Sequence, residues 1–309
     1  MRALLVTNMW PSRARPDRGI FVADQAEAMR RAGVDLDVHH FEPGGAAAYL
    51  RGAARLAGRR GGQYDVIHSH FGLSAWVALA ARGRVRAVTF HGTDLNHPRS
   101  RRISLAALRF TDLPAAASAD LAALIPPGRA KAPVQVLPCG ISLERFTAFD
   151  RGQARSQLGI DPGERVILLP SDPTRPEKRT DRATELAEAT GARLLTLGGI
   201  EPDRVPLFIN AADLVAIPSE REGFGLALLE ALACNRPVLA TPTGIAGEAL
   251  GGVEGALCAE WDLRTWTAAA ESAFAAGTLD SGREIAGRWS ADSCARKVIE
   301  AWETALSRA

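Results

Sequence analysis

Two series of short apolar runs, separated by longer helical segments, constrain the fold of this chain more than any other feature. Short runs bounded by Gly, Pro and Asp are typical of strands that are buried on both faces of a parallel sheet. In the first half the predicted strands are residues 3–7, 34–41, 65–68, 85–90, 115–118 and 134–137, with predicted helices that include 20–32 and 74–82. In the second half the predicted strands are 166–169, 193–197, 214–217 and 237–241. The alternation predicts an α/β protein whose parallel sheets carry helices on both faces.

The chain is long enough for two such halves. At 309 residues it fits about two domains of ordinary size, and its 47% hydrophobic residues can fill two cores. The stretch 146–164 contains several Asp, Gly and Pro residues and is predicted to connect the halves. We therefore expect two Rossmann-like domains, at 1–148 and 149–288, followed by a C-terminal helix within 289–309. Ligands of such folds bind at the carboxyl ends of the strands, so we expect a site in the crevice between the domains.

The segment from Pro218 to Ala231, PSEREGFGLALLEA, is the most informative motif. It follows a predicted strand and opens an apolar helical pattern, so it is predicted to be a loop and a helix start. A helix N-terminus presents unpaired N–H groups and a positive dipole end, and a glycine turn lets a ligand approach the backbone. Glu222 and Glu230 flank this turn and could bind hydroxyl groups beside a phosphate. Ordinary turn chemistry explains the same pattern, so both interpretations stay open at this point.

Charge is distributed unevenly along the chain. Residues 1–145 contain 20 Lys or Arg and 11 Asp or Glu, whereas the remainder contains 17 and 24, which gives net charges of +9 and −7. The basic half favours an anionic acceptor or an anionic membrane surface, with arginine clusters at 51–60 and 99–102. Simple solvation of helix faces is the alternative explanation. Aromatic residues are not interleaved with these arginines, so nucleic acid is not an expected partner.

Histidine and cysteine spacing gives little sign of a metal site. The four cysteines, at 139, 234, 258 and 294, lie far apart without C-x-x-C spacing, so we expect small buried hydrophobic residues and neither disulfides nor zinc. His68 and His70 share one strand face, but a third ligand is not apparent in the sequence. No apolar stretch is long enough to span a bilayer and the N-terminal run is too short for a signal peptide. We therefore expect a cytoplasmic protein, with peripheral contact at the inner face of the membrane as a further expectation.

The motif at 218–231 resembles the signature of nucleotide-sugar glycosyltransferases with the GT-B fold, the retaining group called glycosyltransferase family 4. In that family two Glu residues separated by seven positions surround a Gly-Phe-Gly turn, followed by Ala-x-Ala and Pro-Val, which stand here at 231–233 and 237–238. Further segments that resemble the family are 16–38, 65–70, 88–94, 136–146 and 289–306, so nearly the whole chain is covered. The resemblance implies two Rossmann-like domains and a last helix that crosses back to pack on the N-terminal domain.

The resemblance also implies roles for single residues. Lys178 and Arg175 would neutralise the diphosphate leaving group without a metal, with Arg179 as the alternative to Arg175. His91 would contact the donor hexose near the reaction centre. Glu222 would contact the donor sugar, whereas Glu230 would bind the ribose hydroxyl groups.

The remaining implied contacts are with the backbone. The N–H groups of Gly223, Phe224 and Gly225, together with Leu226, would bind the donor. Gly19 stands where such enzymes let the backbone approach the donor phosphate or the acceptor.

Two features depart from the family pattern. Cys139 stands where Asn is usual before Gly140. The stretch between Gly199 and Ala212 is shorter than in most members by about one strand and helix, as in a short form resembling teichuronic-acid and capsule glycosyltransferases. In the family the missing unit often borders the nucleobase, so the sequence does not indicate which nucleobase the donor carries.

The implied function is that of a retaining hexosyltransferase with a part in making cell-envelope polysaccharide. It would move a sugar from a nucleotide-diphosphate sugar to a carbohydrate, lipid-linked or small-molecule acceptor, with no metal and no cofactor. The alternatives are a catalytically degenerate nucleotide-sugar-binding protein and a sugar-nucleotide epimerase of the same fold.

Overall fold

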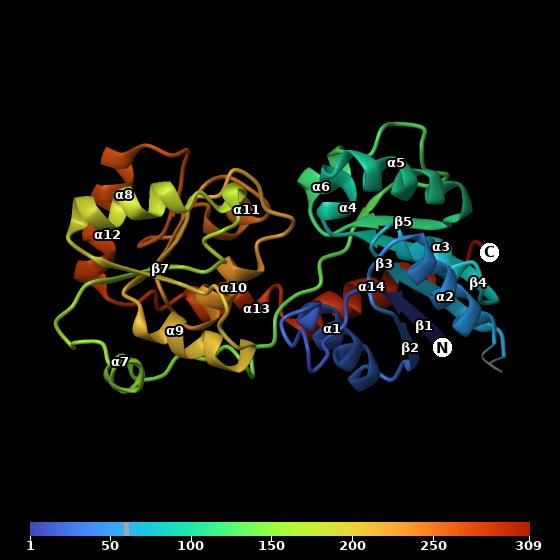
Figure 1. Cartoon of the computed structure of the whole chain (residues 1–309), viewed down its shortest axis with the longest axis horizontal. Helices are drawn as coiled ribbons and strands as arrows, with labels where there is room; N and C mark the ends of the chain where they lie inside the picture. Colours follow the sequence, from blue (N-terminus) through green and yellow to red (C-terminus); the bar gives the residue numbers. More distant parts are fainter. Residues whose placement is uncertain (59–61) are drawn as a thin grey trace. The chain divides into compact units, whose positions relative to one another are not determined.

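The computed structural model describes residues 1–58 and 62–309 and divides into two compact units. Unit 1 comprises Met1–Gly140 and Ala291–Ala309, and unit 2 comprises Ile141–Ser290 (Figure 1). The first boundary precedes the expected position at 148 because Ile141 pairs with the end of unit 2, where its N–H donates to the carbonyl of Trp289 at 3.0 Å. Among the described residues, no helix combines the length and the apolar character that a membrane crossing requires.

Unit 1 contains a parallel sheet with the strand order β2-β1-β3-β4-β5-β6. The strands are β1 (Arg2–Thr7), β2 (Asp35–His40), β3 (Tyr64–His70), β4 (Gly83–Phe90), β5 (Leu113–Ala116) and β6 (Gln135–Val136). The helices are α1 (Ile20–Arg31), α2 (Ala46–Ala57), α3 (Ser74–Ala78), α4 (Thr93–Asn96), α5 (Pro98–Ala107), the 3-10 helix η1 (Leu108–Phe110), α6 (Ala119–Ala123) and α14 (Ala291–Leu306). The expected α/β architecture is confirmed, because every strand pair in this sheet is parallel.

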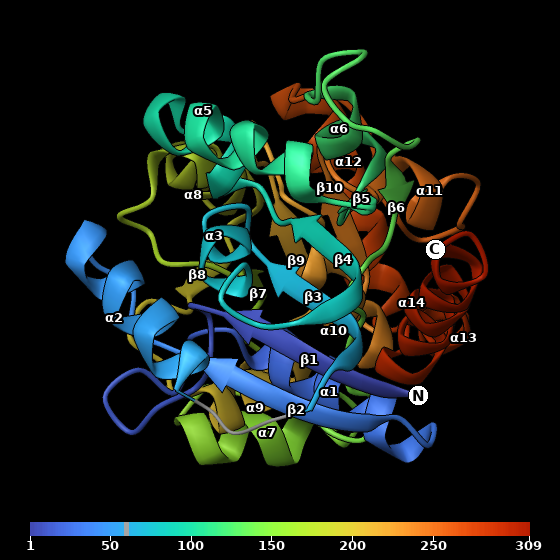
Figure 2. The same cartoon turned by 90° about the vertical axis from the view of Figure 1, so that its right-hand side faces the viewer.

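Helices cover both faces of this sheet (Figure 2). On one face α1 and α14 pack against residues such as Leu5 and Val66, and on the other α2 and α3 pack against Leu4 and Ile67. The predicted return of the last helix is confirmed, since Trp302 of α14 is fully buried against the sheet. Burial of a side chain of this size contributes about 3 kcal/mol to stability.

Unit 2 contains a second parallel sheet with the strand order β11-β10-β9-β7-β8. Its strands are β7 (Val166–Leu169), β8 (Arg193–Thr196), β9 (Leu214–Ile217), β10 (Val238–Ala240) and β11 (Leu257–Cys258). Its helices are α7 (Arg151–Leu158), η2 (Pro176–Lys178), α8 (Thr180–Thr190), η3 (Pro202–Arg204), α9 (Val205–Ala211), α10 (Leu226–Ala233), α11 (Ala246–Leu250), α12 (Leu263–Ala276) and α13 (Gly282–Gly287). Within the described residues this sheet has one strand fewer than that of unit 1.

The interpretation of residues 146–164 as a connection between domains is wrong. The stretch contains α7, which packs on α9 inside unit 2. The Asp150 side chain caps α7 by accepting from the N–H of Gln153, and Gly159 ends it in the left-handed conformation. Arg155 of α7 is buried and donates to the carboxylate of Asp213 at 2.8 Å. Asp150 and Gly159 therefore mark the two ends of a helix.

Candidate functional site

The edge of the unit 2 sheet where β7 and β9 end places two of the predicted site residues side by side. Lys178 is the last residue of η2, which follows β7 after a short loop. Its Nζ donates to Oε1 and Oε2 of Glu222 at 2.8 and 2.7 Å. Only 14% and 13% of the two side chains are exposed, so solvent screens this ion pair less than a surface pair. The chain therefore holds a cation and a carboxylate in a fixed arrangement at the carboxyl ends of the strands.

Two further contacts join the loop after β7 to the loop after β9. The N–H of Glu220 donates to the carbonyl oxygen of Glu177 at 2.9 Å. The guanidinium of Arg179 donates to the carboxylate of Glu220 at 3.0 Å and also binds Asp181. These contacts restrict the movement of Lys178, which lies between Glu177 and Arg179 in the sequence.

The glycine turn of the signature leads directly into α10. Gly225 is the N-cap residue of this helix, with φ of 108°, a conformation that glycine adopts much more readily than other residues. A helix N-terminus carries unpaired N–H groups and a partial positive charge. Because Gly225 has no side chain, it places no atoms beyond its backbone at this end of α10, and a helix N-terminus of this kind suits an anionic or hydroxyl-rich ligand.

A second glycine supports the turn from the other side. The N–H of Ile245 donates to the carbonyl oxygen of Phe224 at 2.9 Å. A Cβ atom at Gly244 would lie 2.3 Å from that same oxygen, and its φ of +60° is left-handed. Phe224 itself is buried, whereas Gly223 and Leu226 are half-buried. The signature turn is thus held by backbone contacts that need glycine at position 244.

The other predicted residues of unit 2 have separate surroundings. Glu230 is half-buried and lies one helical turn beyond Leu226 on α10. The guanidinium of Arg175 is 55% exposed and donates to Glu177 at 2.6 Å. Arg175 also lines an open hollow of about 470 Å³, a hollow that neither Lys178 nor Glu222 lines. The described contacts of Arg175 therefore do not join its charge to the Lys178–Glu222 pair.

In unit 1 the corresponding edge of the sheet carries His91, the residue after β4. The backbone N–H groups of His91 and Gly92 donate to Oδ1 of Asp94 at 3.1 and 2.9 Å. The N–H of Gly72 donates to Oδ2 of the same side chain at 3.1 Å. Asp94 is buried and so ties the loop after β3 to the loop after β4. This carboxylate, for which no sequence pattern predicted a role, fixes the backbone that carries His91.

Gly19 lies at the same edge and has a structural reason to be glycine. It precedes α1 in the left-handed conformation, with φ of 68°. A Cβ atom there would lie 2.5 Å from the carbonyl carbon and oxygen of Met9. Two residues further on, the ring of Phe21 packs on the ring of His91 with 5.2 Å between centroids. The structure therefore brings the Gly19 loop and His91 together.

His68 and His70 project from one strand face but have different partners. Nε1 of Trp302 donates to Nδ1 of His68 at 3.0 Å. The proton of His68 is therefore on Nε2, which donates to Oγ1 of Thr89 at 2.8 Å. Both ring nitrogens of His68 therefore have hydrogen-bond partners within unit 1. Nδ1 of His70, in contrast, lies 3.0 Å from Nε2 of His91.

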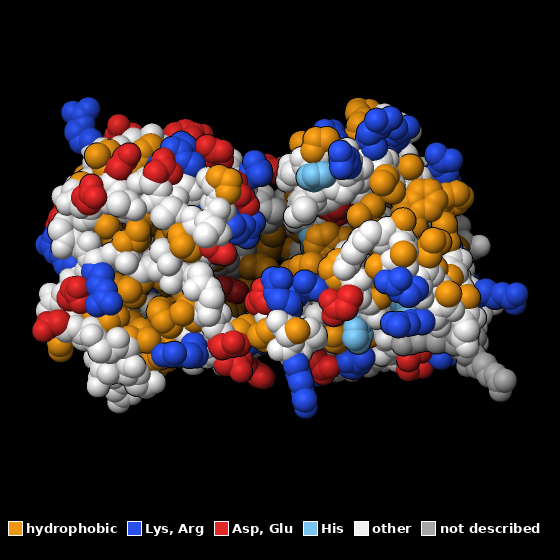
Figure 3. Space-filling view, viewed as in Figure 1, with side chains coloured by type: hydrophobic (Ala, Val, Ile, Leu, Met, Phe, Trp, Pro, Cys, Tyr) orange, Lys and Arg blue, Asp and Glu red, His pale blue; other side chains and the backbone are white. Residues whose placement is uncertain are grey.

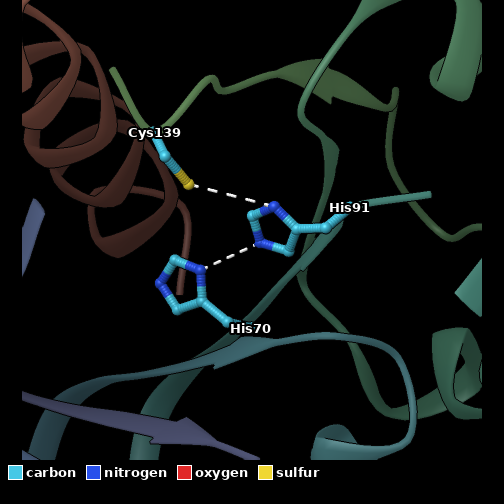
Figure 4. A group of neighbouring side chains, drawn as sticks. All are labelled: His70, His91 and Cys139. Carbon is cyan, nitrogen blue, oxygen red and sulfur yellow. Dashed lines mark hydrogen bonds between the residues drawn. The ribbon is translucent and has the colours of Figure 1, made fainter. Parts of the chain in front are cut away.

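Cys139 joins these two histidines (Figure 4). Its sulfur lies 3.9 Å from Nδ1 of His91, and one ligand atom from each of His70, His91 and Cys139 lies within 4.8 Å of the others. His68 and His70 share one strand face as the spacing indicated, but the residues that come together are His70, His91 and Cys139. Cys139 is buried as expected, and in addition its sulfur contacts the imidazole of His91. The signal available in the sequence was its departure from the usual Asn.

Burial controls the protonation of this group. It lowers the pKa of His70 to about 3 and lowers the pKa of His91 well below its usual value, with a further contribution from His70. Both rings are therefore neutral near pH 7. Nε2 of His70 is buried and has no hydrogen-bond partner among the described residues. Leaving such a group unmatched costs about 1–3 kcal/mol.

Positive charge gathers on unit 1 over α5 (Figure 3). Arg99 and Arg102 are exposed there, whereas Arg101 donates to the carbonyl oxygen of Leu124 at 2.8 Å. Arg51 and Arg55 of the other predicted cluster are exposed on α2, and residues 59 and 60 lie outside the described residues. Ile103, beside Arg102, is an apolar residue that is 51% exposed.

Two parts of the chain match family models. Residues 40–145 match the model described as Glycosyltransferase Family 4, and residues 166–275 match the model described as Glycosyl transferases group 1. The second match contains the Lys178–Glu222 pair, and the first contains His70, His91 and Cys139.

Relatives with curated names include several D-inositol 3-phosphate glycosyltransferases. That from Actinosynnema mirum is 32% identical, and the match covers 65% of this chain and 62% of the relative. That from Segniliparus rotundus is 28% identical, with 85% and 72% covered. The chain spans less than two thirds of the length of the Actinosynnema mirum relative and of the one from Rhodococcus erythropolis.

Solved structures share the fold at low sequence identity. A glycosyltransferase from Rickettsia africae has a TM-score of 0.74 at 15% identity, with 100% of this chain and 99% of that chain covered. Anabaena HepE, solved in complex with UDP-glucose, has a TM-score of 0.73 at 18% identity, with 98% and 100% covered. Both likenesses extend over the two parallel-sheet units.

Proposed function

Because this chain belongs to the GT-B glycosyltransferases of the family 4 and group 1 type, we propose that it transfers a sugar from a nucleotide-diphosphate sugar to an acceptor. The observation that carries the proposal is the Lys178–Glu222 pair in the loops that lead to the N-terminus of α10. A cation, a carboxylate and a helix N-terminus together suit a ligand with a diphosphate and several hydroxyl groups.

Lys178 is proposed to stabilise the leaving diphosphate. An ammonium group has three donors, and two of them are directed at Glu222. The third has no partner among the described residues and is proposed to bind a phosphate oxygen, while Glu222 accepts a hydroxyl group of the donor sugar. Glu230 is proposed to bind the ribose, with N–H groups from Gly223 to Leu226 also directed at the donor. Arg175 or Arg179 is proposed as the second phosphate contact.

The proposed reaction retains the configuration at the anomeric carbon and needs no metal. The bond between this carbon and the diphosphate breaks, the acceptor oxygen bonds to the same face, and the acceptor proton passes to the departing phosphate oxygen. Positioned charge, supplied by Lys178, is the chief contribution of the protein. His91 is proposed to contact the donor hexose, and the Gly19 loop is proposed to approach the donor phosphate or the acceptor.

The acceptor is proposed to be a carbohydrate, a lipid-linked sugar or a small molecule, in keeping with a part in making cell-envelope polysaccharide. The names of the relatives add D-inositol 3-phosphate as a specific candidate. The exposed arginines and Ile103 on α5 support peripheral contact with an anionic membrane from the cytoplasmic side.

A panel assay tests the proposal. The protein is incubated with sugars linked to several nucleoside diphosphates, each with D-inositol 3-phosphate, simple sugars and lipid-linked sugars. Acceptor-dependent release of nucleoside diphosphate, with the donor configuration kept in the product by NMR, is the expected result. Donor binding without release for any acceptor would favour a binding protein, and an isomerised donor would favour an epimerase.

A further inference from the structure

The group of His70, His91 and Cys139, here called the His–His–Cys cluster, has a geometry close to that of a metal site. Its members come from the end of β3, the residue after β4 and the segment after β6. Figure 4 shows the sulfur of Cys139 and nitrogens of both imidazole rings turned toward one another. All three residues lie within unit 1.

The separations between the ligand atoms bracket those of a tetrahedral zinc site. Zn–N bonds of about 2.0–2.1 Å and Zn–S bonds of about 2.3 Å place neighbouring ligand atoms about 3.3–3.7 Å apart. In the cluster His70 Nδ1 and His91 Nε2 are 3.0 Å apart, and no separation within the group of three ligand atoms exceeds 4.8 Å. His91 faces His70 with Nε2 and Cys139 with Nδ1. A single ion would bind one of these nitrogens, and the other partner would have to shift by about 1 Å to reach it.

The chemistry of the donor set selects one class of cation. Two imidazoles and a thiolate suit Zn²⁺, whereas Mg²⁺ and Ca²⁺ prefer oxygen ligands. Metal binds imidazole in its neutral form and cysteine as the thiolate, so binding at the cluster would release the Cys139 proton to water.

The hydrogen bonding of His70 in the cluster differs from that of the neighbouring His68. His68 has a hydrogen-bond partner at each ring nitrogen, Trp302 and Thr89. His70, only 1% exposed, has one matched nitrogen and one that is unmatched among the described residues. The unmatched nitrogen is Nε2, whereas Nδ1 faces His91, so an ion bound to the cluster would replace the His70–His91 hydrogen bond.

We propose that the His–His–Cys cluster binds Zn²⁺ through His70, His91 and Cys139, with water as the fourth ligand, and that the bound ion inhibits sugar transfer by occupying a nitrogen of His91. The inhibitory part rests on the proposed function, in which His91 contacts the donor. The site is distinct from the metal-free chemistry proposed for Lys178.

Binding is tested without any donor or acceptor. Tag-free protein is titrated with Co²⁺, which gives a thiolate-to-metal charge-transfer band when it binds a cysteine, and Zn²⁺ is then added as competitor. We expect one equivalent of Co²⁺ to produce the band and Zn²⁺ to remove it. Cys139→Ser should abolish the band and weaken Zn²⁺ binding at least about tenfold, since even residues that only support a ligand have effects of this size.

The control is Cys258→Ser, which removes a partly exposed thiol in unit 2 and should leave the band unchanged. His70→Gln tests the second ligand, and circular dichroism confirms that each variant is folded. A band that persists in Cys139→Ser, or the absence of stoichiometric binding to the wild-type protein, would overturn the site.

Inhibition is measured separately, as the ratio of turnover with and without Zn²⁺ for each protein. The ratio should fall for the wild type and stay near one for Cys139→Ser. Zn²⁺ that binds the cluster but leaves wild-type turnover unchanged would overturn the inhibitory part. A lack of turnover with every donor would instead contradict the proposed function, while the cobalt titration would still decide the site.

Discussion

The ammonium of Lys178 lies 2.8 and 2.7 Å from the two carboxylate oxygens of Glu222, although 44 positions separate the residues in the chain. The pair connects the loop after β7 to the loop after β9. A lysine that is already held in place loses little side-chain freedom when a ligand binds. In the proposed function, the ion pair would therefore hold a cation in position for a phosphate group before the donor binds.

Replacing Lys178 by alanine should lower kcat by about 10²–10³-fold, the usual cost of losing one group that stabilises transition-state charge. Steady-state release of nucleoside diphosphate measures the effect. Lys297→Ala, which removes an exposed lysine of α14, is the matched control and should keep wild-type turnover. Equal rates for the two variants would rule out a role for Lys178 in the transfer step.

Gly244→Ala should weaken donor binding and destabilise unit 2 by about 1–3 kcal/mol, because the new Cβ atom meets the Phe224 carbonyl oxygen and the backbone is left-handed. Thermal unfolding with and without donor measures both effects. Gly247→Ala is the control, since a Cβ atom there meets nothing within 4 Å and the residue lies in α11. It should be neutral or stabilise by up to about 1 kcal/mol. An equal response of both variants would contradict the packing argument.

The sequence was a good guide to the sheets because strands buried on both faces appear as continuous apolar runs. The strands 166–169 and 214–217 were placed at their observed bounds. β11 was not identified, because its two residues are too few to form a pattern. α7 was missed because its cap residues, Asp150 and Gly159, are also the residues typical of loops.

Less of the candidate site than of the fold could be predicted from the sequence. Residue types and the family resemblance named Lys178, Glu222 and His91, but no pattern within the chain reports a contact across tens of residues. The contact between Cys139 and His91 spans 48 positions and depends on where the segment after β6 ends. Asp94 lies within the segment 88–94 that resembles the family, yet its three backbone hydrogen bonds form only once the loops after β3 and β4 are folded.

Asp213→Ala should lower the free energy of unfolding by about 3–5 kcal/mol, because it leaves the buried guanidinium of Arg155 without its carboxylate. It also removes the acceptor for the N–H of Val166. Urea unfolding measures the change. Glu271→Ala breaks the exposed pair with Arg165 and should cost less than about 1 kcal/mol. A loss below 1 kcal/mol for Asp213→Ala would contradict the importance of this ion pair for anchoring α7.

Chelation should leave turnover intact. The proposed transfer uses Lys178 as its cation, so treatment with EDTA followed by gel filtration should not reduce the rate of donor consumption. Activity that disappears on chelation and returns with Mg²⁺ or Mn²⁺ would contradict the metal-free mechanism. A modest increase after chelation is expected if the preparation contains Zn²⁺ at the His–His–Cys cluster.

Trp302 fills the core of unit 1 from α14, and α14 follows the whole of unit 2 in the sequence. During synthesis on the ribosome, residues 141–290 therefore emerge before the helix that completes unit 1. Unit 2 can acquire its full set of residues first, while the first 140 residues wait with the α14 face of their sheet uncovered. The domain translated first is thus the one completed last, and the apolar α14 face of its sheet stays exposed until the final helix has been synthesised.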